Sequence, residues 1–169
     1  MEIKTNRLTI RRLTPDTAQA IHENSLDENT RRFVPDEVFE TLAEARETVD
    51  YLISCYDSSE PNPLVYGIFL DKNCIGYVQA VPMDEGKWEI GYHIAEKHTR
   101  KGYATEAVKA FLPEIMQKLA LTEILGVCLK ENAASVKVME RCGFEKVFSG
   151  VGRYQGKEHP ICRYIYKAP

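Results

Sequence analysis

Residues 94–107 read Ile-Ala-Glu-Lys-His-Thr-Arg-Lys-Gly-Tyr-Ala-Thr-Glu-Ala, and this is the most informative stretch of the chain. An apolar run with strand character, Trp88 to Ile94, leads into it, and a helix with apolar residues at helical spacing starts after Gly102. The first amides of a helix lack carbonyl partners, and the helix dipole favours negative charge there. Gly102 lets a ligand approach the backbone, while Arg100 and Lys101 add positive charge. The stretch predicts either a site for an anion such as pyrophosphate or a plain strand-to-helix turn.

A second informative segment, residues 132–144, reads Asn-Ala-Ala-Ser-Val-Lys-Val-Met-Glu-Arg-Cys-Gly-Phe. It follows another apolar strand, Ile124 to Leu129. Asn132 or Ser135 can cap a short helix that ends at Gly143, a residue suited to the position after a helix. The second segment therefore repeats the order of strand, turn and helix N-terminus.

Together the two segments resemble the GCN5-related N-acetyltransferase (GNAT) family. The pyrophosphate loop of that family follows the pattern Gln/Arg-x-x-Gly-x-Gly/Ala, which Gly102 and Ala104 match. A later family motif runs Asn-x-x-Ser-x-x-x-x-Glu-x-x-Gly-Phe, and the residues that match it are Asn132, Ser135, Glu140, Gly143 and Phe144. The combination of the two motifs is specific, although short motifs taken singly have a high false-positive rate.

The start of the chain, Thr5 to Leu13, resembles the opening strand of the branch of ribosomal-protein N-terminal acetyltransferases (RimJ/RimL-like). The resemblance therefore covers essentially the whole chain. Two residues depart from the pattern: Thr99 stands where the family usually has Gln or Arg, and Arg100 where this branch often has Gly.

Composition sets the broad class. The 169 residues, 44% hydrophobic and 28% charged, suit one soluble domain over 1–169 with a real core. A net charge of −3 leaves no basic stripe for nucleic acid, and no stretch approaches the ~20 apolar residues of a membrane span. Five cysteines without a Cys-x-x-Cys pair argue against a disulfide framework and a zinc site, so we expect no metal. With no signal peptide at the N-terminus, these features predict a cytoplasmic protein.

The order of predicted elements is that of an α+β domain. We expect helices after Thr14 (to about Glu23), Thr41, Gly102 and Asn132, and a loop with a short turn over 24–40. Pro113 predicts a kink or an early end of its helix near 110–112. The predicted strands are 8–13, 65–70, 74–81, 88–94, 124–129, 144–154 and 161–166. The resemblance implies a GNAT-like mixed, mostly antiparallel central sheet flanked by helices and splayed between its fourth and fifth strands.

The resemblance also implies an activity, the transfer of an acetyl group from acetyl-CoA to a primary amine by direct attack. The amine would be a protein N-terminus or a small molecule, and the sequence leaves a homodimer open. Pantetheine would lie against the backbone of Tyr92, His93 and Ile94. Asn132 would lie near the pantetheine or the adenosine. The pyrophosphate would be held by Arg100, Lys101, Gly102, Tyr103, Ala104 and Thr105.

Three residues are candidates for the chemistry. Glu89 shares one face of its strand with Gly91 and His93, and it could accept the amine proton through water or simply lie on a solvent-facing edge. His93 is a second candidate base or a structural residue. Ser135 could donate to the leaving sulfur, as a hydroxyl does in related enzymes, or be a plain N-cap. The alternative for Asn132 is a turn residue, and its matched motif spacing argues against that alternative.

The acceptor side is less defined. Phe33, with Val34 and Phe39, could line the acceptor pocket or anchor a loop, and Tyr154 could border the pocket or be a rim aromatic. Glu106 and Glu140 fit the exposed surface of helices. No nucleophile elbow, P-loop or His-Glu-x-x-His motif offers competing chemistry. The alternative to an enzyme is a catalytically silent acyl-CoA-binding sensor or interaction module, because fold does not guarantee activity.

Overall fold

In the computed structural model, which describes residues 1–169, eight strands form one open sheet in the order β1-β2-β3-β4-β5-β6-β8-β7. Neighbouring strands are antiparallel except for β5 and β6, which are parallel. The mixed, mostly antiparallel sheet expected from the sequence is thereby confirmed. The strands are β1 (Glu2–Lys4), β2 (Thr9–Arg12), β3 (Leu64–Leu70), β4 (Asn73–Pro82), β5 (Trp88–Ile94), β6 (Glu123–Leu129), β7 (Glu145–Tyr154) and β8 (Lys157–Lys167).

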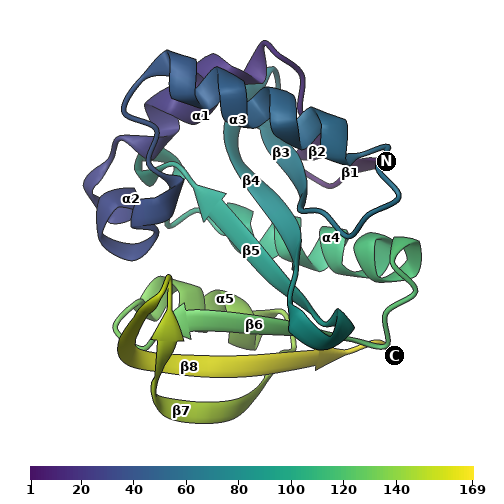
Figure 1. Ribbon diagram of the computed structural model, residues 1–169, viewed down its shortest axis with the longest axis vertical. Helices are drawn as coiled ribbons and strands as arrows, with labels where there is room; N and C mark the ends of the chain where they lie inside the picture. The colour runs from purple at the N-terminus through teal and green to yellow at the C-terminus, as the bar shows by residue number, and fades with distance from the viewer.

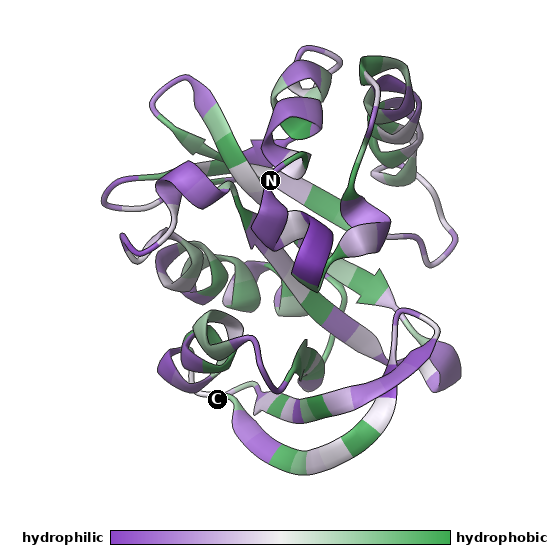
Figure 2. Ribbon diagram, turned by 90° about the vertical axis from the view of Figure 1, so that its left-hand side faces the viewer, coloured by the Kyte–Doolittle hydropathy of each residue, from purple (hydrophilic) through white to green (hydrophobic).

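Helices cover both faces of the sheet, with α1 and α3 on one side and α4 and α5 on the other (Figure 1). A cluster of 23 buried residues fills the α4 and α5 side, and a smaller one of six lies under α1 and α3. The apolar colouring of the central strands and the polar outer faces of the helices are visible in Figure 2. The helices are α1 (Thr17–Ser25), α2 (Glu28–Phe33), α3 (Leu42–Cys55), α4 (Tyr103–Lys118) and α5 (Ala133–Arg141), with short 3₁₀ turns η1 (Pro35–Glu37), η2 (Asp84–Gly86) and η3 (Glu96–His98).

The sheet parts between β5 and β6. These strands are seven residues long, yet only Glu89 and Ile90 have partners, Leu125 and Gly126. The strands start side by side and then diverge toward their C-terminal ends (Figure 1). They are the fourth and fifth strands of the predicted set, because β1 was not foreseen. The opening therefore lies where the sequence predicted it.

Gly126 brings α5 close to the sheet at the closed end of this opening. A Cβ added at Gly126 would lie 2.5 Å from the terminal methyl carbon of Met139, which is buried. The methionine side chain therefore occupies the space above the glycine. This contact sets α5 on β6 next to the residues that pair with β5.

Three local features differ from what the sequence led us to expect. Residues 24–40 contain a true helix, α2, because the Asp27 side chain accepts a hydrogen bond from the Thr30 amide and caps it. Strand β1 was missed, because a three-residue strand carries little periodic signal. Helix α4 runs past Pro113 to Lys118. Pro113 is exposed, and the residues on both sides of it, Phe111, Leu112, Ile115 and Met116, are buried and hold the helix to the core.

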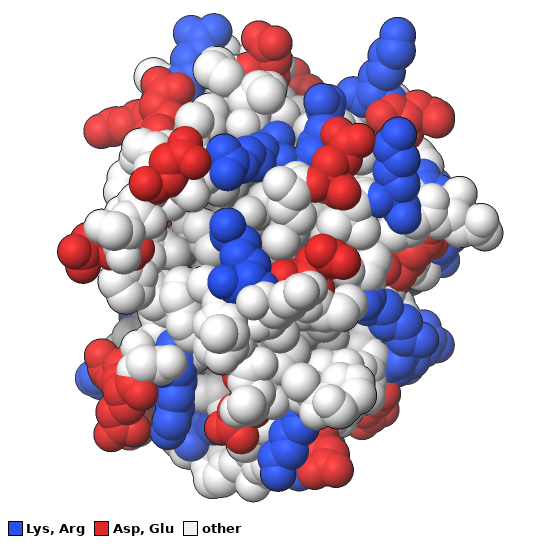
Figure 3. Space-filling model, turned by 90° about the vertical axis from the view of Figure 1, so that its right-hand side faces the viewer, with Lys and Arg blue, Asp and Glu red and all other residues white.

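The surface carries both signs of charge. On the face shown in Figure 3, Lys and Arg alternate with Asp and Glu without a large area of one sign. None of the helices combines the length and the apolar character needed to cross a membrane.

Tyr56 ties α3 to the sheet and gives a test of the fold. Its hydroxyl accepts a hydrogen bond from the Leu13 amide at 2.9 Å and donates one to the Val65 carbonyl. Tyr56→Phe should lower the free energy of unfolding by about 1–3 kcal/mol, because the buried Leu13 amide loses its partner. Urea unfolding measures this loss. Tyr51→Phe, on an exposed side chain of the same helix, should change stability by less than about 0.5 kcal/mol, and equal effects of the two substitutions would contradict the assignment.

Candidate active site

The turn before α4 presents a row of free amides. Arg100 and Gly102 adopt left-handed backbone conformations, with φ of 62° and 80°, and Gly102 is the N-cap residue without a side-chain cap. No backbone carbonyl accepts a hydrogen bond from any amide between Arg100 and Thr105, whereas the Glu106 amide bonds to the Gly102 carbonyl at 3.1 Å. Six consecutive N–H groups at a helix N-terminus suit a ligand with several anionic oxygens.

The space in front of this turn is open. A Cβ added at Gly102 would meet only one atom within 4 Å, Nη2 of Arg7 at 3.4 Å. Arg100, Lys101 and Gly102 are exposed, and Tyr103, Ala104 and Thr105 are half-buried at the start of the helix. The residues predicted for the pyrophosphate therefore lie together on one continuous turn, and their charge and free donors fit that group.

The next part of the site is the free edge of β5. Tyr92, His93 and Ile94 pair with β4 on one side, but they have no partner on β6, so their other backbone edge faces the opening. The Tyr92 side chain points toward α5. Its hydroxyl lies 2.7 Å from Ser135 Oγ and 3.1 Å from the Ser135 carbonyl oxygen. Burial raises the pKa of this phenol above its ordinary value, so Tyr92 keeps its proton.

Ser135 is not the cap of α5. The Asn132 side chain accepts a hydrogen bond from the Ser135 amide at 3.2 Å, so Asn132 is the N-cap. This contradicts the simple capping interpretation of Ser135 and leaves its hydroxyl to pair with Tyr92. The Asn132 side-chain carbonyl is already engaged in the cap. The N-terminus of α5 thus meets the open edge of β5 through a pair of hydroxyl groups.

Glu89 lies on the opposite face of β5 from Tyr92, as the alternation of the strand predicted. The Glu89 side chain forms no hydrogen bond with another residue, and it is only partly exposed. Burial, and then the nearby charge of Glu37, raises the pKa of this carboxyl to about 7. A carboxyl group with that pKa is suited to accept a proton near neutral pH.

Glu37 is a residue that the sequence did not single out. Its carboxylate accepts hydrogen bonds from the Tyr77 hydroxyl and from Gln79 Nε2 at 3.0 Å. Burial raises its pKa, while these two donors oppose the rise. Gln79 lies over Gly91 of the neighbouring strand, where an added Cβ would come within 2.7 Å of its Nε2. No local pattern reveals Glu37, because its partners are 40 residues or more away along the chain.

Phe33 and Tyr154, both predicted at the acceptor site, are joined by one hydrogen bond. The Tyr154 hydroxyl donates to the Phe33 carbonyl at 2.7 Å, which links the end of α2 to the end of β7. Beside it, Arg32 forms an ion pair with Glu131 at 3.3 Å. Burial raises the pKa of Tyr154, and the negative charges of Glu37 and Glu89 raise it further. The contact between Tyr154 and Phe33 thus joins the β7 end of the sheet to α2.

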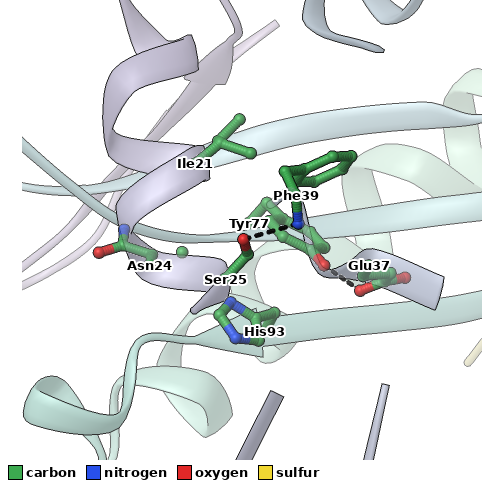
Figure 4. A pocket seen from close by; sticks show the side chains of 8 residues that line it. Ile21, Asn24, Ser25, Glu37, Phe39, Tyr77 and His93 are labelled. Atoms are coloured by element: carbon green, nitrogen blue, oxygen red, sulfur yellow. Dashed lines mark hydrogen bonds between the residues drawn. The ribbon is translucent and has the colours of Figure 1, made fainter. Parts of the chain in front are cut away.

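The His93 side chain points away from the open strand edge. Its ring stacks on Tyr77 with centroids 5.3 Å apart, and its Nε2 lies 2.6 Å from Thr30 Oγ1. The ring borders a small cavity of about 10 Å³ that is also lined by Ser25 and Glu37 (Figure 4). Burial lowers the pKa of His93, so the ring is neutral at pH 7. These contacts give the histidine side chain a packing role under α2.

Glu106 lies on the surface of α4, and its carboxylate is engaged there by the segment between β1 and β2. Its carboxylate accepts hydrogen bonds from the Thr5 hydroxyl and from the Arg7 amide, at 2.7 and 2.9 Å. The first turn of α4 is therefore fixed to the segment between β1 and β2.

Comparisons with known proteins agree with this geometry. A family model described as an acetyltransferase (GNAT) domain matches residues 7–145. The uncharacterized N-acetyltransferase YnaD of Bacillus subtilis (strain 168) is 32% identical over 148 residues, which are 86% of this chain and 84% of that protein. A GNAT-family acetyltransferase from Bacillus anthracis, 25% identical, has a TM-score of 0.82 and covers 99% of this chain and 98% of its own.

A structure of RimL, a ribosomal L7/L12 alpha-N-protein acetyltransferase in complex with coenzyme A, has the same fold. Its TM-score is 0.84 at 19% identity, with 99% of this chain and 98% of that chain covered. This likeness shows that the two proteins share the fold. The motifs, the parted sheet and the matching family model together show that this chain belongs to the GNAT family of N-acetyltransferases.

Proposed function

We propose that this protein uses acetyl-CoA to acetylate a primary amine, by direct attack of the amine on the thioester. The observation that carries the proposal is the opening between β5 and β6. Free amides line its mouth before α4, and Glu89 lies on the other face of the same strand. Donor and acceptor can then approach from opposite faces of the sheet and meet at the gap.

The acyl-donor side is built from backbone groups. The amides of Arg100 to Thr105 would hold the pyrophosphate, with Arg100 and Lys101 adding charge. The unpaired edge of Tyr92 to Ile94 would orient the pantetheine arm along the opening. Acetyl-CoA supplies the activated acyl group, and the chain supplies its orientation.

On the acceptor side, the amine must lose its proton before it can attack. An α-amino group has a pKa of about 8, so most of it is charged at neutral pH. Glu89, with a pKa of about 7, would take this proton directly or through a water molecule. Phe33 and Tyr154 would border the acceptor, and a protein N-terminus or a small amine meets these needs equally.

The departing thiolate needs a proton or a hydrogen bond. Ser135 is placed to provide it, because its hydroxyl lies at the N-terminus of α5 beside the open strand edge. When Tyr92 donates its own proton to Ser135 Oγ, the serine proton is free to face the sulfur. The pair thus works as a short donor chain.

The second candidate is an acyl-CoA-binding sensor that does not turn over. One observation favours it: Thr99, which replaces the family's Gln or Arg, donates its hydroxyl to the Glu96 carbonyl at 2.7 Å. That hydroxyl is therefore already engaged within the protein and adds no donor to the turn. Release of free thiol from acetyl-CoA above the hydrolysis background, with a panel of peptides and small amines, distinguishes the enzyme from the sensor.

Gly102→Val tests the donor site. The substitution places a side chain where the phosphate would lie and strains a backbone with φ of 80°, so it should abolish CoA binding measured by calorimetry. Gly86→Val is the matched control, because Gly86 has φ of 71° and no atom within 4 Å of an added Cβ. The control should bind CoA normally. No binding of millimolar CoA by the unmodified protein would end the proposal.

Glu89→Gln tests the base. Because a carboxylate accepts a proton only when ionised, kcat/KM should rise with pH through about 7 in the unmodified enzyme. Glutamine cannot accept the proton, so turnover should fall by ~10²–10⁴-fold. The rise of kcat/KM through about pH 7 should disappear, because it reports the ionisation of Glu89. The affinity for CoA should stay nearly unchanged.

Two companion variants sharpen that measurement. Glu37→Gln removes the neighbouring charge that helps to raise the pKa of Glu89, so the rise should move to lower pH. Glu145→Gln, on an exposed side chain at the start of β7, should leave the profile in place. Near-normal turnover of Glu89→Gln at neutral pH would show that Glu89 is structural and that the amine arrives already neutral.

Ser135→Ala tests the thiolate donor. We expect turnover with acetyl-CoA to fall by about 10²-fold, while the rise of kcat/KM with pH persists. The loss should shrink with an acetyl thioester of a more acidic thiol, because a better leaving group needs less assistance. Ser149→Ala on β7 serves as the control. An equal loss with both thioesters would show that Ser135 acts elsewhere than on the sulfur.

A further inference from the structure

The segment between β1 and β2 reaches across to the turn before α4. Arg7 Nε donates to Glu106 Oε2 at 2.7 Å, and the Arg7 amide donates to Glu106 Oε1 at 2.9 Å. The Thr5 hydroxyl donates to the same Oε1 at 2.7 Å. Glu106 therefore fixes both the backbone and the guanidinium of Arg7, although 99 residues separate the two.

The rest of the Arg7 side chain contacts the turn itself. Its Nη1 donates to the Lys101 carbonyl at 2.8 Å, and the guanidinium carbon lies 4.6 Å from the centre of the Tyr103 ring. Its Nη2 is 3.4 Å from the position of a Cβ at Gly102. One arginine thus contacts Lys101 and Tyr103, which flank Gly102 in the turn whose amides are free.

The contact with Lys101 has a consequence for the direction of an amide. In a trans peptide the carbonyl and the N–H point in opposite directions across one plane. Holding the Lys101 carbonyl toward Arg7 therefore aims the Gly102 N–H to the other side, away from the protein segment that supplies Arg7. That amide is one of the six that donate no hydrogen bond to a backbone carbonyl.

The turn also needs support because its conformation is unfavourable by itself. Arg100 is a non-glycine residue at φ of 62°, and such residues persist only where their surroundings hold them. Six consecutive N–H groups of this turn, from Arg100 to Thr105, donate to no backbone carbonyl. No side chain caps α4 to relieve this arrangement.

We propose that Arg7 is a positioning residue for the pyrophosphate turn. It holds the Lys101 carbonyl, fixes the direction of the Gly102 amide and is itself oriented by Glu106. The inference rests on the proposed use of acetyl-CoA, and it assigns to the Thr5-Asn6-Arg7 segment a role in cofactor affinity. A lysine cannot replace Arg7, because a single ammonium lacks the planar fork that reaches Glu106 and Lys101 together.

The test compares two ligands, CoA and pantetheine, where pantetheine lacks the diphosphate. Arg7→Ala and Arg7→Lys should both weaken CoA binding by about 10- to 10²-fold in calorimetry, an effect in the range of one lost charge-assisted contact. Pantetheine binding should not change. In turnover assays KM for acetyl-CoA should rise while kcat at saturation stays within about twofold.

Two further variants keep the test decisive. Glu106→Gln leaves an acceptor for Arg7 but removes the negative charge. It should therefore weaken CoA binding less than Arg7→Ala does, and it should leave pantetheine binding unchanged. Arg11→Ala is the matched control, because Arg11 also stacks on an aromatic ring, Phe69 at 4.1 Å, and makes no contact with the turn. Arg11→Ala should leave both ligands unaffected, and thermal unfolding checks that all variants are folded.

The outcomes separate this inference from the proposed function. If the unmodified protein binds CoA and Arg7→Ala binds it equally well, the inference is wrong and the proposed function stands. Equal weakening of CoA and pantetheine would also overturn it, because Arg7 would then support the fold in general. If the unmodified protein binds no CoA, the proposed function fails and the inference fails with it.

Discussion

The rest of this structure depends on the early separation of β5 from β6. Two pairs of residues join these parallel strands, and beyond them each strand continues without the other. The separation leaves backbone groups of β5 unpaired and places the N-termini of α4 and α5 at the same opening. Buried polar backbone groups are costly without partners, so such an edge is stable only where a ligand or water can reach it. The architecture itself therefore marks the site.

The two faces of β5 have different chemistry, and the alternation of the strand produces the difference. Tyr92 faces the hydroxyl of Ser135, while Glu89 faces a region that also contains Glu37. Free amides dominate on one side and buried carboxyls on the other. One face of β5 is thus suited to bind an anionic acyl donor, and the opposite face of the same strand is suited to deprotonate a cationic amine.

Much of the fold followed from local patterns. The helix after Thr41, the two strands over 65–70 and 74–81 and the alternation of β5 were predicted and are confirmed. The failures also have physical causes. The helix α2 depends on a single cap at Asp27, and α4 continues past Pro113 because core contacts outweigh the lost hydrogen bond.

The sequence by itself determined the family, the positions of the two helix-opening motifs and the side of β5 on which Glu89 lies. The family follows from the resemblance of the two motifs, and the side of β5 follows from the alternation of a strand, so both depend only on short stretches of sequence. Only the tertiary structure decided which distant residues meet: Glu37 with Gln79, Tyr154 with Phe33, and Arg7 with Lys101. Such pairs are set by how the strands and helices pack against one another, and a single sequence contains no local signal for contacts across 42 to 121 residues.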